Sequence, residues 1–237
     1  MFPTKNIFSS VLLSGILLCT AANSTRADIV TVLFTGFFTQ VPGSGMEALN
    51  MHLRDRFDST MPSVIYSGRA FEYDERELAL EFINSIDQVD KLYLIGHSFG
   101  GSSALQLAEN FLAPTNVRVD LTFQIDSVDN PLGGPPDNIL PSNVDAGFNY
   151  YQRSTGIIEP QGEMFVEGAQ NFNVEVLFDD TTITHTSIDN DIRLHERIFN
   201  DITLELVPEP KSVPFLLAGF STLLLARHRR DRIANQL

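Results

Sequence analysis

A serine between glycines, Ser98, is the residue of this chain best placed to act as a nucleophile. It stands in Gly96-His97-Ser98-Phe99-Gly100-Gly101, after the apolar run 92–95 and before the helix-forming run 102–109. Because glycines have no Cβ, the chain can turn tightly on both sides of the serine and project its hydroxyl from the end of a strand. The helix N-terminus behind it favours negative charge that develops there. The sequence therefore predicts a nucleophile elbow of the pattern G-x-S-x-G.

The residues around this turn resemble the α/β-hydrolase superfamily, whose lipases and thioesterases often carry Gly-His-Ser-x-Gly-Gly. The resemblance is strongest over residues 92–109. It implies an α/β-hydrolase fold, a triad in the chain order serine, acid, histidine, and an oxyanion hole made of backbone N–H groups. The five-residue pattern also arises by chance in loops, but the strand before it and the helix after it favour a catalytic serine.

The general base is predicted to be a histidine, because a serine hydroxyl is a poor nucleophile until its proton is taken. The histidines after Ser98 are His185, His195 and His228. His228 lies in a basic tail, and His195 falls on the apolar side of a predicted helix, as a packed histidine would. His185 follows the last predicted strand, where the superfamily's base comes. We predict His185 as the base, with a structural loop histidine as the alternative.

The carboxylate that orients this histidine is predicted to be Asp126, at the end of the predicted strand 117–125. Some lipases place their acid at this position. No strand fits between Asp180 and the histidine, so the predicted strand 173–178 delivers the histidine itself and the acid must come earlier. Asp129, three residues farther on, is the alternative acid. A simple turn cap is the alternative role for Asp126.

Two backbone N–H groups are predicted to bind the oxyanion, those of Phe99 and Phe37. Phe99 directly follows the serine, and Phe37 lies in the loop after the predicted strand 28–34. Phe38 is the alternative to Phe37. An ordinary loop whose phenylalanines cover the core is an equally good interpretation, because backbone donors leave little trace in a sequence.

Strands alternating with helical runs predict a compact α/β domain, a mostly parallel sheet with helices on both faces. The irregular stretch from about 131 to 170 has the length of a lid or binding loop. Its Phe148, Tyr150 and Tyr151 either line an acyl pocket or, as we favour, anchor the loop to the core. The predicted strands are 28–34, 63–67, 91–95, 117–125 and 173–178, and the predicted helices are 46–57, 74–86, 102–112 and 188–206.

The other polar candidates have plainer interpretations. We predict that His97 has a structural or pocket-side role, that His52 is solvated, and that residues 189–191 cap the last helix. No cysteine or histidine cluster has zinc spacing, no glycine loop matches a nucleotide fingerprint, and no EF-hand pattern appears. We therefore predict no metal ion and no cofactor.

The composition indicates a packed, acidic protein. Hydrophobic residues make up 43% of the 237-residue chain and charged residues 19%, and the formal charge is −14 with both ends basic. An acidic surface repels nucleic acid and anionic membranes, which argues against both as partners. The single cysteine, Cys19, lies in the N-terminal apolar run, so the rest of the chain can form no disulfide.

Both ends of the chain look like export signals. Residues 1–27 combine Lys5, a short apolar run and Thr25-Arg26-Ala27, which predicts a signal peptide cleaved after residue 27. A buried first helix is the alternative. A lipoprotein signal is rejected because Leu18, not a small residue, precedes the cysteine.

The tail 208–237 follows a hydrolase domain that we place at 28–207. Its order of Pro208-Glu209-Pro210, the apolar run 213–226 and an arginine cluster resembles the PEP-CTERM sorting signal of bacterial exported proteins. That resemblance implies a transient anchor that sorting machinery at the inner membrane recognises and removes, and delivery to the cell surface or exterior. The apolar run is short for a membrane span, and a buried hairpin or helix is its alternative interpretation.

These observations together predict an exported serine hydrolase of the lipase or carboxylesterase type, acting on small-molecule or lipid esters. Several alternatives remain open. A thioesterase or acyltransferase would use the same residues, and a serine peptidase is less favoured. A surface-binding or matrix-binding protein that retains the fold without catalysis is the alternative from a different class.

Overall fold

The computed structural model describes residues 27–37, 39–129, 138–154 and 160–206. The predicted signal peptide, apart from Ala27, and the whole of the predicted sorting tail 208–237 lie outside these ranges. No helix among the described residues is both long and apolar enough to cross a membrane.

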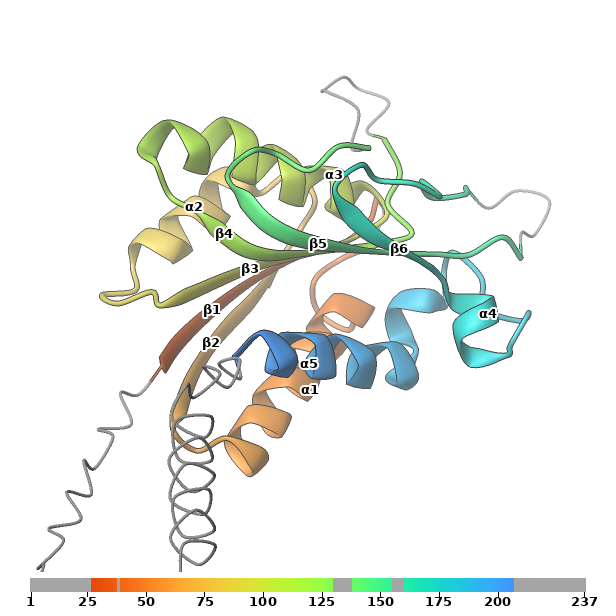
Figure 1. Ribbon diagram of the computed structural model, residues 1–237, viewed down its shortest axis with the longest axis horizontal. Coiled ribbons are helices and arrows are strands. Elements are labelled where there is room, and N and C mark those ends of the chain that lie inside the picture. Colours follow the sequence, from red (N-terminus) through yellow and green to blue (C-terminus); the bar gives the residue numbers. More distant parts are fainter. Residues whose placement is uncertain (1–26, 38, 130–137, 155–159, 207–237) are drawn as a thin grey trace, which may run out of the picture.

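Six strands and five α-helices make up the described chain (Figure 1). The strands are β1 (Ala27–Phe34), β2 (Val64–Phe71), β3 (Lys91–His97), β4 (Val119–Ile125), β5 (Val144–Tyr151) and β6 (Ala169–Asn173). The helices are α1 (Gly45–Thr60), α2 (Arg76–Asn84), α3 (Phe99–Gln106), α4 (Val174–Phe178) and α5 (Ile192–Leu206). α3 continues through a π-helical segment (Leu107–Leu112) and a 3₁₀ turn (Ala113–Thr115), and another 3₁₀ turn (Ile188–Asn190) precedes α5.

The strands form one sheet in the order β2-β1-β3-β4-β5-β6, with every neighbouring pair parallel. The predicted α/β architecture with a parallel central sheet is therefore confirmed. β1 and β3 lie side by side. From β1 the chain continues to β2 on one side of this pair, and from β3 it continues to β4, β5 and β6 on the other side. In open parallel sheets, ligands bind in the crevice outside the carboxyl ends of such a strand pair.

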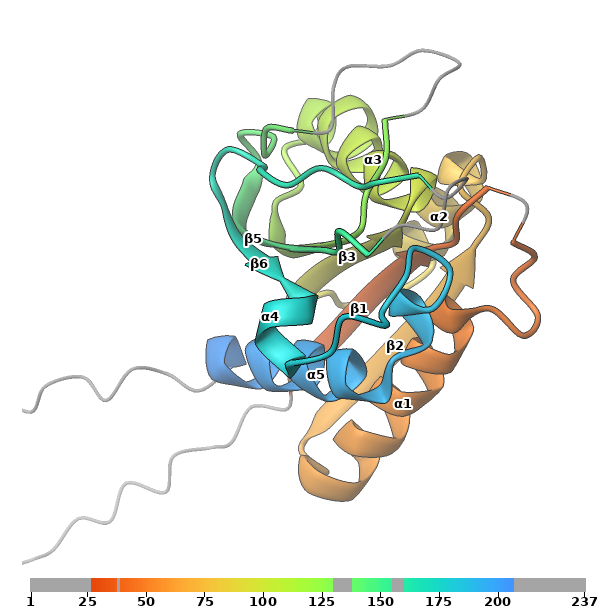
Figure 2. The ribbon, with the colours of Figure 1, turned by 90° about the vertical axis from the view of Figure 1, so that its right-hand side faces the viewer.

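Helices cover both faces of the sheet. α2 and α3 lie on one face and α1 and α5 on the other, in both views (Figure 1, Figure 2). Successive strand side chains point to opposite faces, so β1 supplies both cores. Ile29 and Leu33 pack in the core with α1 and α5, whereas Val30 and Val32 pack in the core with α2 and α3.

The start of α1 fixes the loop that follows β1. Ser44 caps the helix by accepting a hydrogen bond from the Glu47 N–H at 3.1 Å, and the Glu47 carboxylate accepts one from the Gly43 N–H at 2.6 Å. This is close to a capping box, in which cap and third helical residue satisfy backbone donors on both sides of the helix start. The helix then buries an apolar stripe, Met46, Leu49, Leu53 and Phe57.

One predicted strand is wrong. Residues 173–178 read as a strand, but β6 ends at Asn173 and the following five residues form α4. The Asn173 side chain accepts hydrogen bonds from the N–H groups of Glu175 and Val176 at 2.8 and 3.2 Å. An asparagine cap starts a helix, and a short apolar run after it is ambiguous between helix and strand.

The stretch predicted as irregular contains β5. Gly147 and Asn149 interrupt its apolar pattern, yet both lie inside the sheet between β4 and β6. Phe148 and Tyr150 are buried in the core, in keeping with the anchoring role that we favoured, while Tyr151 is partly buried with the Arg153 guanidinium over its ring.

Candidate active site

Ser98 occupies a strained turn between β3 and α3. Its backbone angles are φ 55° and ψ −127°, a conformation that costs energy for any residue with a Cβ and persists only where the surroundings enforce it. Its N–H donates to the Ile125 carbonyl at 3.0 Å, and its carbonyl accepts from the N–H groups of Gly101 and Val128 at 3.0 and 3.2 Å. These bonds hold the serine at the carboxyl end of β3.

Glycines around the turn are required by close backbone approach. A Cβ on Gly96 would lie 2.1 Å from the Gly100 carbonyl oxygen, which belongs to the backbone and cannot move aside. In the loop after β1, a Cβ on Gly36 would lie 3.0 Å from the Cβ of Ser98 and 3.5 Å from its Oγ. The loop that carries Phe37 therefore packs against the serine.

The structure brings Ser98, His185 and Asp126 together in one hydrogen-bonded chain. His185 Nε2 lies 2.9 Å from Ser98 Oγ, and His185 Nδ1 lies 2.7 Å from Asp126 Oδ2. All three residues are buried, with exposed fractions of 6%, 5% and 0%. They come from segments far apart in sequence, the ends of β3 and β4 and the loop before α5, which only the parallel sheet brings together.

Asp126 is bound by several donors besides the histidine. Its Oδ1 accepts from the N–H groups of Gln152 and Gly162 at 3.2 and 3.1 Å, and its Oδ2 accepts from Gln152 Nε2 at 2.8 Å. Burial acts to raise the pKa of Asp126, but the hydrogen bonds from His185 and Gln152 outweigh it, so the pKa lies below its ordinary value. Asp129, the alternative acid, is exposed.

An ionised carboxylate fixes the tautomer of His185. A carboxylate only accepts hydrogen bonds, so His185 Nδ1 must carry the proton that it shares with Asp126. In the neutral ring Nε2 then carries a lone pair, 2.9 Å from the Ser98 hydroxyl. Ser98, His185 and Asp126 are therefore arranged so that the histidine can accept the serine proton.

The sequence did not indicate Gln152 as a donor to Asp126, because no characteristic spacing relates a glutamine to a carboxylate 26 residues earlier.

His97 supports the main chain of His185. Its Nε2 lies 2.8 Å from the His185 carbonyl oxygen, which can only accept, so Nε2 carries a proton. Burial, the largest influence, lowers the pKa of His97 below the ordinary value of 6.5, although Asp189 acts to raise it. His97 is thus a neutral, buried residue with a structural role, as predicted, and its contact is with the backbone of the residue that faces Ser98.

This lowered pKa predicts how stability depends on pH. The folded state binds a proton on His97 less tightly than the unfolded chain does. The contribution of the neutral ring to the unfolding free energy is therefore fully present above pH 6.5, and it is lost as the pH falls through the lowered pKa. Asp189, His185 and Asp126 interact electrostatically with the ring and modulate the effect. We expect His97→Gln, which keeps an N–H donor but does not titrate, to lose less unfolding free energy than wild type between about pH 7.5 and about pH 5. Urea unfolding at both pH values measures this, and equal losses would contradict it.

Two sequence-based assignments of polar residues are wrong. Asp189 does not cap α5, because it is buried and faces His97, with Oδ2 3.5 Å from His97 Nδ1. Asp191 does cap it, accepting from Arg193 N at 2.9 Å through its side chain. His52 is not simply solvated, because its side chain is only 15% exposed and its Nε2 lies 3.4 Å from Glu196 Oε1.

A pocket of about 160 Å³ opens beside Ser98. Phe37 lines it, in the loop against the serine, whereas Phe38 lies outside the described residues. Most of the lining is polar. The residues are Gly36, Phe37, Thr39, Gly43, Ser44, Gly45, His97, Ser98, His185, Thr186, Asp189 and Asn190.

Three aromatic rings gather around the same turn. Phe37 lies 5.6 Å from Tyr73 and 5.5 Å from Phe99 between ring centroids, and Tyr73 lies 6.0 Å from Phe99. Phe37 remains 43% exposed. The site thus combines a polar pocket with a group of aromatic contacts, and Phe37 takes part in both.

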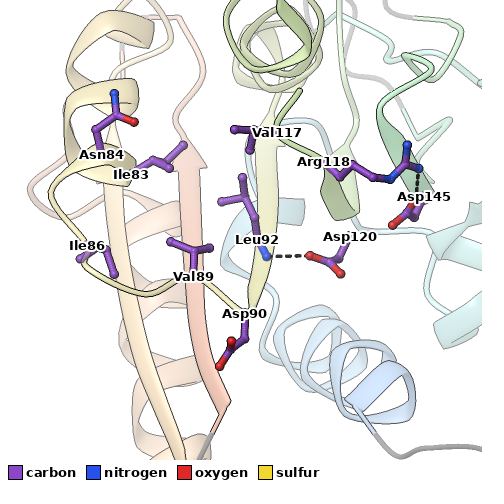
Figure 3. A pocket seen from close by; sticks show the side chains of 10 residues that line it. All are labelled: Ile83, Asn84, Ile86, Val89, Asp90, Leu92, Val117, Arg118, Asp120 and Asp145. Carbon is purple, nitrogen blue, oxygen red and sulfur yellow. Dashed lines mark hydrogen bonds and ion pairs between the residues drawn. The ribbon is translucent and has the colours of Figure 1, made fainter. Parts of the chain in front are cut away.

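A larger hollow of about 550 Å³ lies at the opposite, amino-terminal edge of the sheet (Figure 3). Its charged side chains already have partners. Asp120 accepts from the Leu92 N–H and from Lys91, and Arg118 pairs with Asp145. Within the described ranges, no three histidine, cysteine, aspartate or glutamate side chains are grouped so that they could hold a metal ion.

Comparisons with known proteins leave the family open. No protein-family model matches the chain, and no curated protein is significantly similar to it in sequence. Among solved structures, Est1E from Butyrivibrio proteoclasticus is similar, with a TM-score of 0.47 and 11% identity, over 76% of this chain and 89% of that chain.

Proposed function

We propose that this protein is an exported serine hydrolase that cleaves carboxylic esters. The observation that carries the proposal is the hydrogen-bonded chain from Ser98 Oγ through His185 to Asp126, buried at the carboxyl end of β3. Its three members have the residue types and the order of contacts of a catalytic triad. The strained backbone of Ser98 supports the proposal further, because strain of this kind gathers at functional sites.

The proposed reaction has two halves. Ser98 Oγ attacks the ester carbonyl while its proton passes to His185 Nε2, and Asp126 stabilises the imidazolium that forms. The N–H groups of Phe99 and Phe37 bind the oxyanion. The C–O bond to the alcohol then breaks, the alcohol leaves with the proton from His185, and an acyl group remains on Ser98. Water attacks this acyl-enzyme with the same histidine as base, releasing the acid and restoring the serine.

Several features support an enzyme over a binding protein that merely retains the fold. A binding protein without catalytic activity does not need a strained serine, a carboxylate that fixes the tautomer of a histidine, or four hydrogen bonds to that carboxylate. Each of these features restricts the sequence without adding a binding surface.

The polar lining beside Ser98 supports a short ester more than a long-chain lipid as the substrate. Export is part of the proposal on the grounds of the terminal sequences alone.

Covalent labelling tests the proposal directly. We expect a fluorophosphonate carrying a reporter group to modify wild-type protein at Ser98, because such phosphonates react with serines that a neighbouring base activates. Mass spectrometry of the digested protein locates the adduct. Ser98→Ala should remain unlabelled. Absence of labelling in folded wild-type protein, or an adduct on another serine, would count against the proposed function.

A further inference from the structure

Asp189 is a buried carboxylate in the pocket beside Ser98, and the proposed triad does not use it. Its side chain is 6% exposed. Oδ1 accepts a hydrogen bond from Asn190 Nδ2 at 3.0 Å, and Oδ2 lies 3.5 Å from His97 Nδ1. His97 Nε2 donates a hydrogen bond to the His185 carbonyl oxygen. In the neutral ring Nδ1 therefore carries a lone pair and cannot donate a hydrogen bond to Asp189. Nδ1 is itself buried without a hydrogen-bond partner.

Two acceptors thus face each other with no proton between them. A buried acceptor without a donor, such as His97 Nδ1, is costly, and native structures keep such an atom where a ligand or another role compensates for it. The first turn of α1 lies against the Asp189 carboxylate, since a Cβ on Gly45 would lie 2.4 Å from Oδ2, and a helix N-terminus stabilises negative charge. A hydrogen-bond donor that enters the pocket between these two acceptors would stabilise both.

The pocket itself limits what that donor can be. Its volume of about 160 Å³ admits a small group, and Thr39, Ser44, Thr186 and Asn190 give it further polar walls. A hydroxyl on a short chain fits these conditions, whereas a long alkyl chain exceeds this volume and brings no donor to Asp189. Ser98 lines the same pocket, so the hydroxyl would belong to the ester that the serine attacks.

We infer that Asp189 forms a specificity subsite that accepts a hydrogen bond from a hydroxyl group of the substrate, a few bonds from the scissile carbonyl. The inference rests on the proposed ester hydrolysis by Ser98 and narrows its substrate class to hydroxylated short esters. A site built to bond a substrate hydroxyl discriminates against the methyl analogue, because that analogue leaves the buried acceptor unpaired.

Matched ester pairs that exchange hydroxyl for methyl test the subsite on either side of the carbonyl. For the alcohol side the pair is 2-hydroxyethyl acetate and propyl acetate. For the acyl side it is the 4-nitrophenyl esters of 3-hydroxybutanoic acid and 3-methylbutanoic acid. We expect wild-type protein to favour the hydroxyl member of one pair by roughly 10- to 100-fold in kcat/KM, the range for a hydrogen bond to a charged group.

Asp189→Asn should reduce that preference by at least about tenfold, because the amide keeps the shape of the side chain but loses its charge. Asp87→Asn removes the same charge from an exposed position between α2 and β3 and serves as the matched control, with the wild-type preference retained. Near-equal rates within both pairs for wild type, or a preference that survives in Asp189→Asn, would overturn the subsite. So would a preference for acetylcholine over 3,3-dimethylbutyl acetate without any hydroxyl preference, since the pocket would then select charge.

Binding without turnover separates this inference from the proposed function. Ser98→Ala protein is titrated with both members of each pair while the ring signals of His97 are followed by NMR. We expect the hydroxyl ester to shift these signals at concentrations where the methyl ester does not, and Asp189→Asn to abolish the difference. Selective binding with no hydrolysis by wild type would refute the hydrolase and keep the subsite. Hydrolysis without selective binding would refute the subsite and keep the hydrolase.

Discussion

Ser98→Ala is expected to lower kcat for 4-nitrophenyl acetate by about 10,000-fold or more, because it removes the oxygen on which the proposed acyl-enzyme forms. Alanine removes only the oxygen that lies 2.9 Å from His185 Nε2, and the methyl group left behind fits where the Cβ already is. The turn is held by backbone bonds of residue 98, which alanine also makes. Stopped-flow or steady-state release of 4-nitrophenol measures the effect, and KM should change far less than kcat.

The matched control for this loss is another serine to alanine change. Ser59→Ala lies on the exposed face of α1, where the hydroxyl bonds only to carbonyls of its own helix. We expect wild-type rates from it. A Ser98→Ala protein that hydrolysed the ester as fast as wild type would show that the nucleophile lies elsewhere. Circular dichroism of both variants checks that they are folded.

The elbow and the architecture could be predicted from sequence because both depend on local chemistry. Gly96 and Gly100 are needed where backbones approach closely, and the strand and helix on either side have clear apolar patterns. Alternation of strands and helices was enough to predict a parallel sheet, as the strand order confirms. These features involve residues close together in the chain.

The end of the sheet could not be predicted, because there the local signals conflict. β5 carries Gly147 and Asn149, residues that disfavour strands in isolation and are tolerated because neighbouring strands bond to them on both sides. Residues 174–178 are apolar enough for a strand, and only the Asn173 side chain decides for a helix. Tertiary pairing and one cap outweighed intrinsic preference.

The site shows the same division. His185 and Asp126 could be proposed from chain order, and the structure places His185 between Asp126 and Ser98, in contact with both. Asp189 read as a helix cap because it precedes a helix in an Asp-Asn-Asp run. Asp189 and His97 are 92 residues apart in the chain, and no spacing pattern in a single sequence predicts a contact between two such residues.

Asp126→Asn is expected to lower kcat by about 10,000-fold while the fold persists, since the carboxylate sets the tautomer of the base. An asparagine is neutral. If its amide faces His185 Nδ1 as a donor, the proton moves to Nε2 and the histidine can no longer accept from Ser98; if its oxygen faces Nδ1, the imidazolium loses its counter-charge. Both arrangements slow the same step. Initial rates with 4-nitrophenyl acetate across the pH range measure the loss.

Asp129→Asn decides between the two carboxylates that the sequence left open. Asp129 is exposed in the loop after β4, whereas Asp126 is 0% exposed and lies 2.7 Å from His185 Nδ1. We therefore expect Asp129→Asn to change kcat by less than about twofold, the scale of surface substitutions away from buried networks. Because each change removes one negative charge at positions three residues apart, a difference between them reflects the hydrogen bond to the histidine and not the local potential. A large loss in Asp129→Asn with a small one in Asp126→Asn would reverse the assignment of the acid.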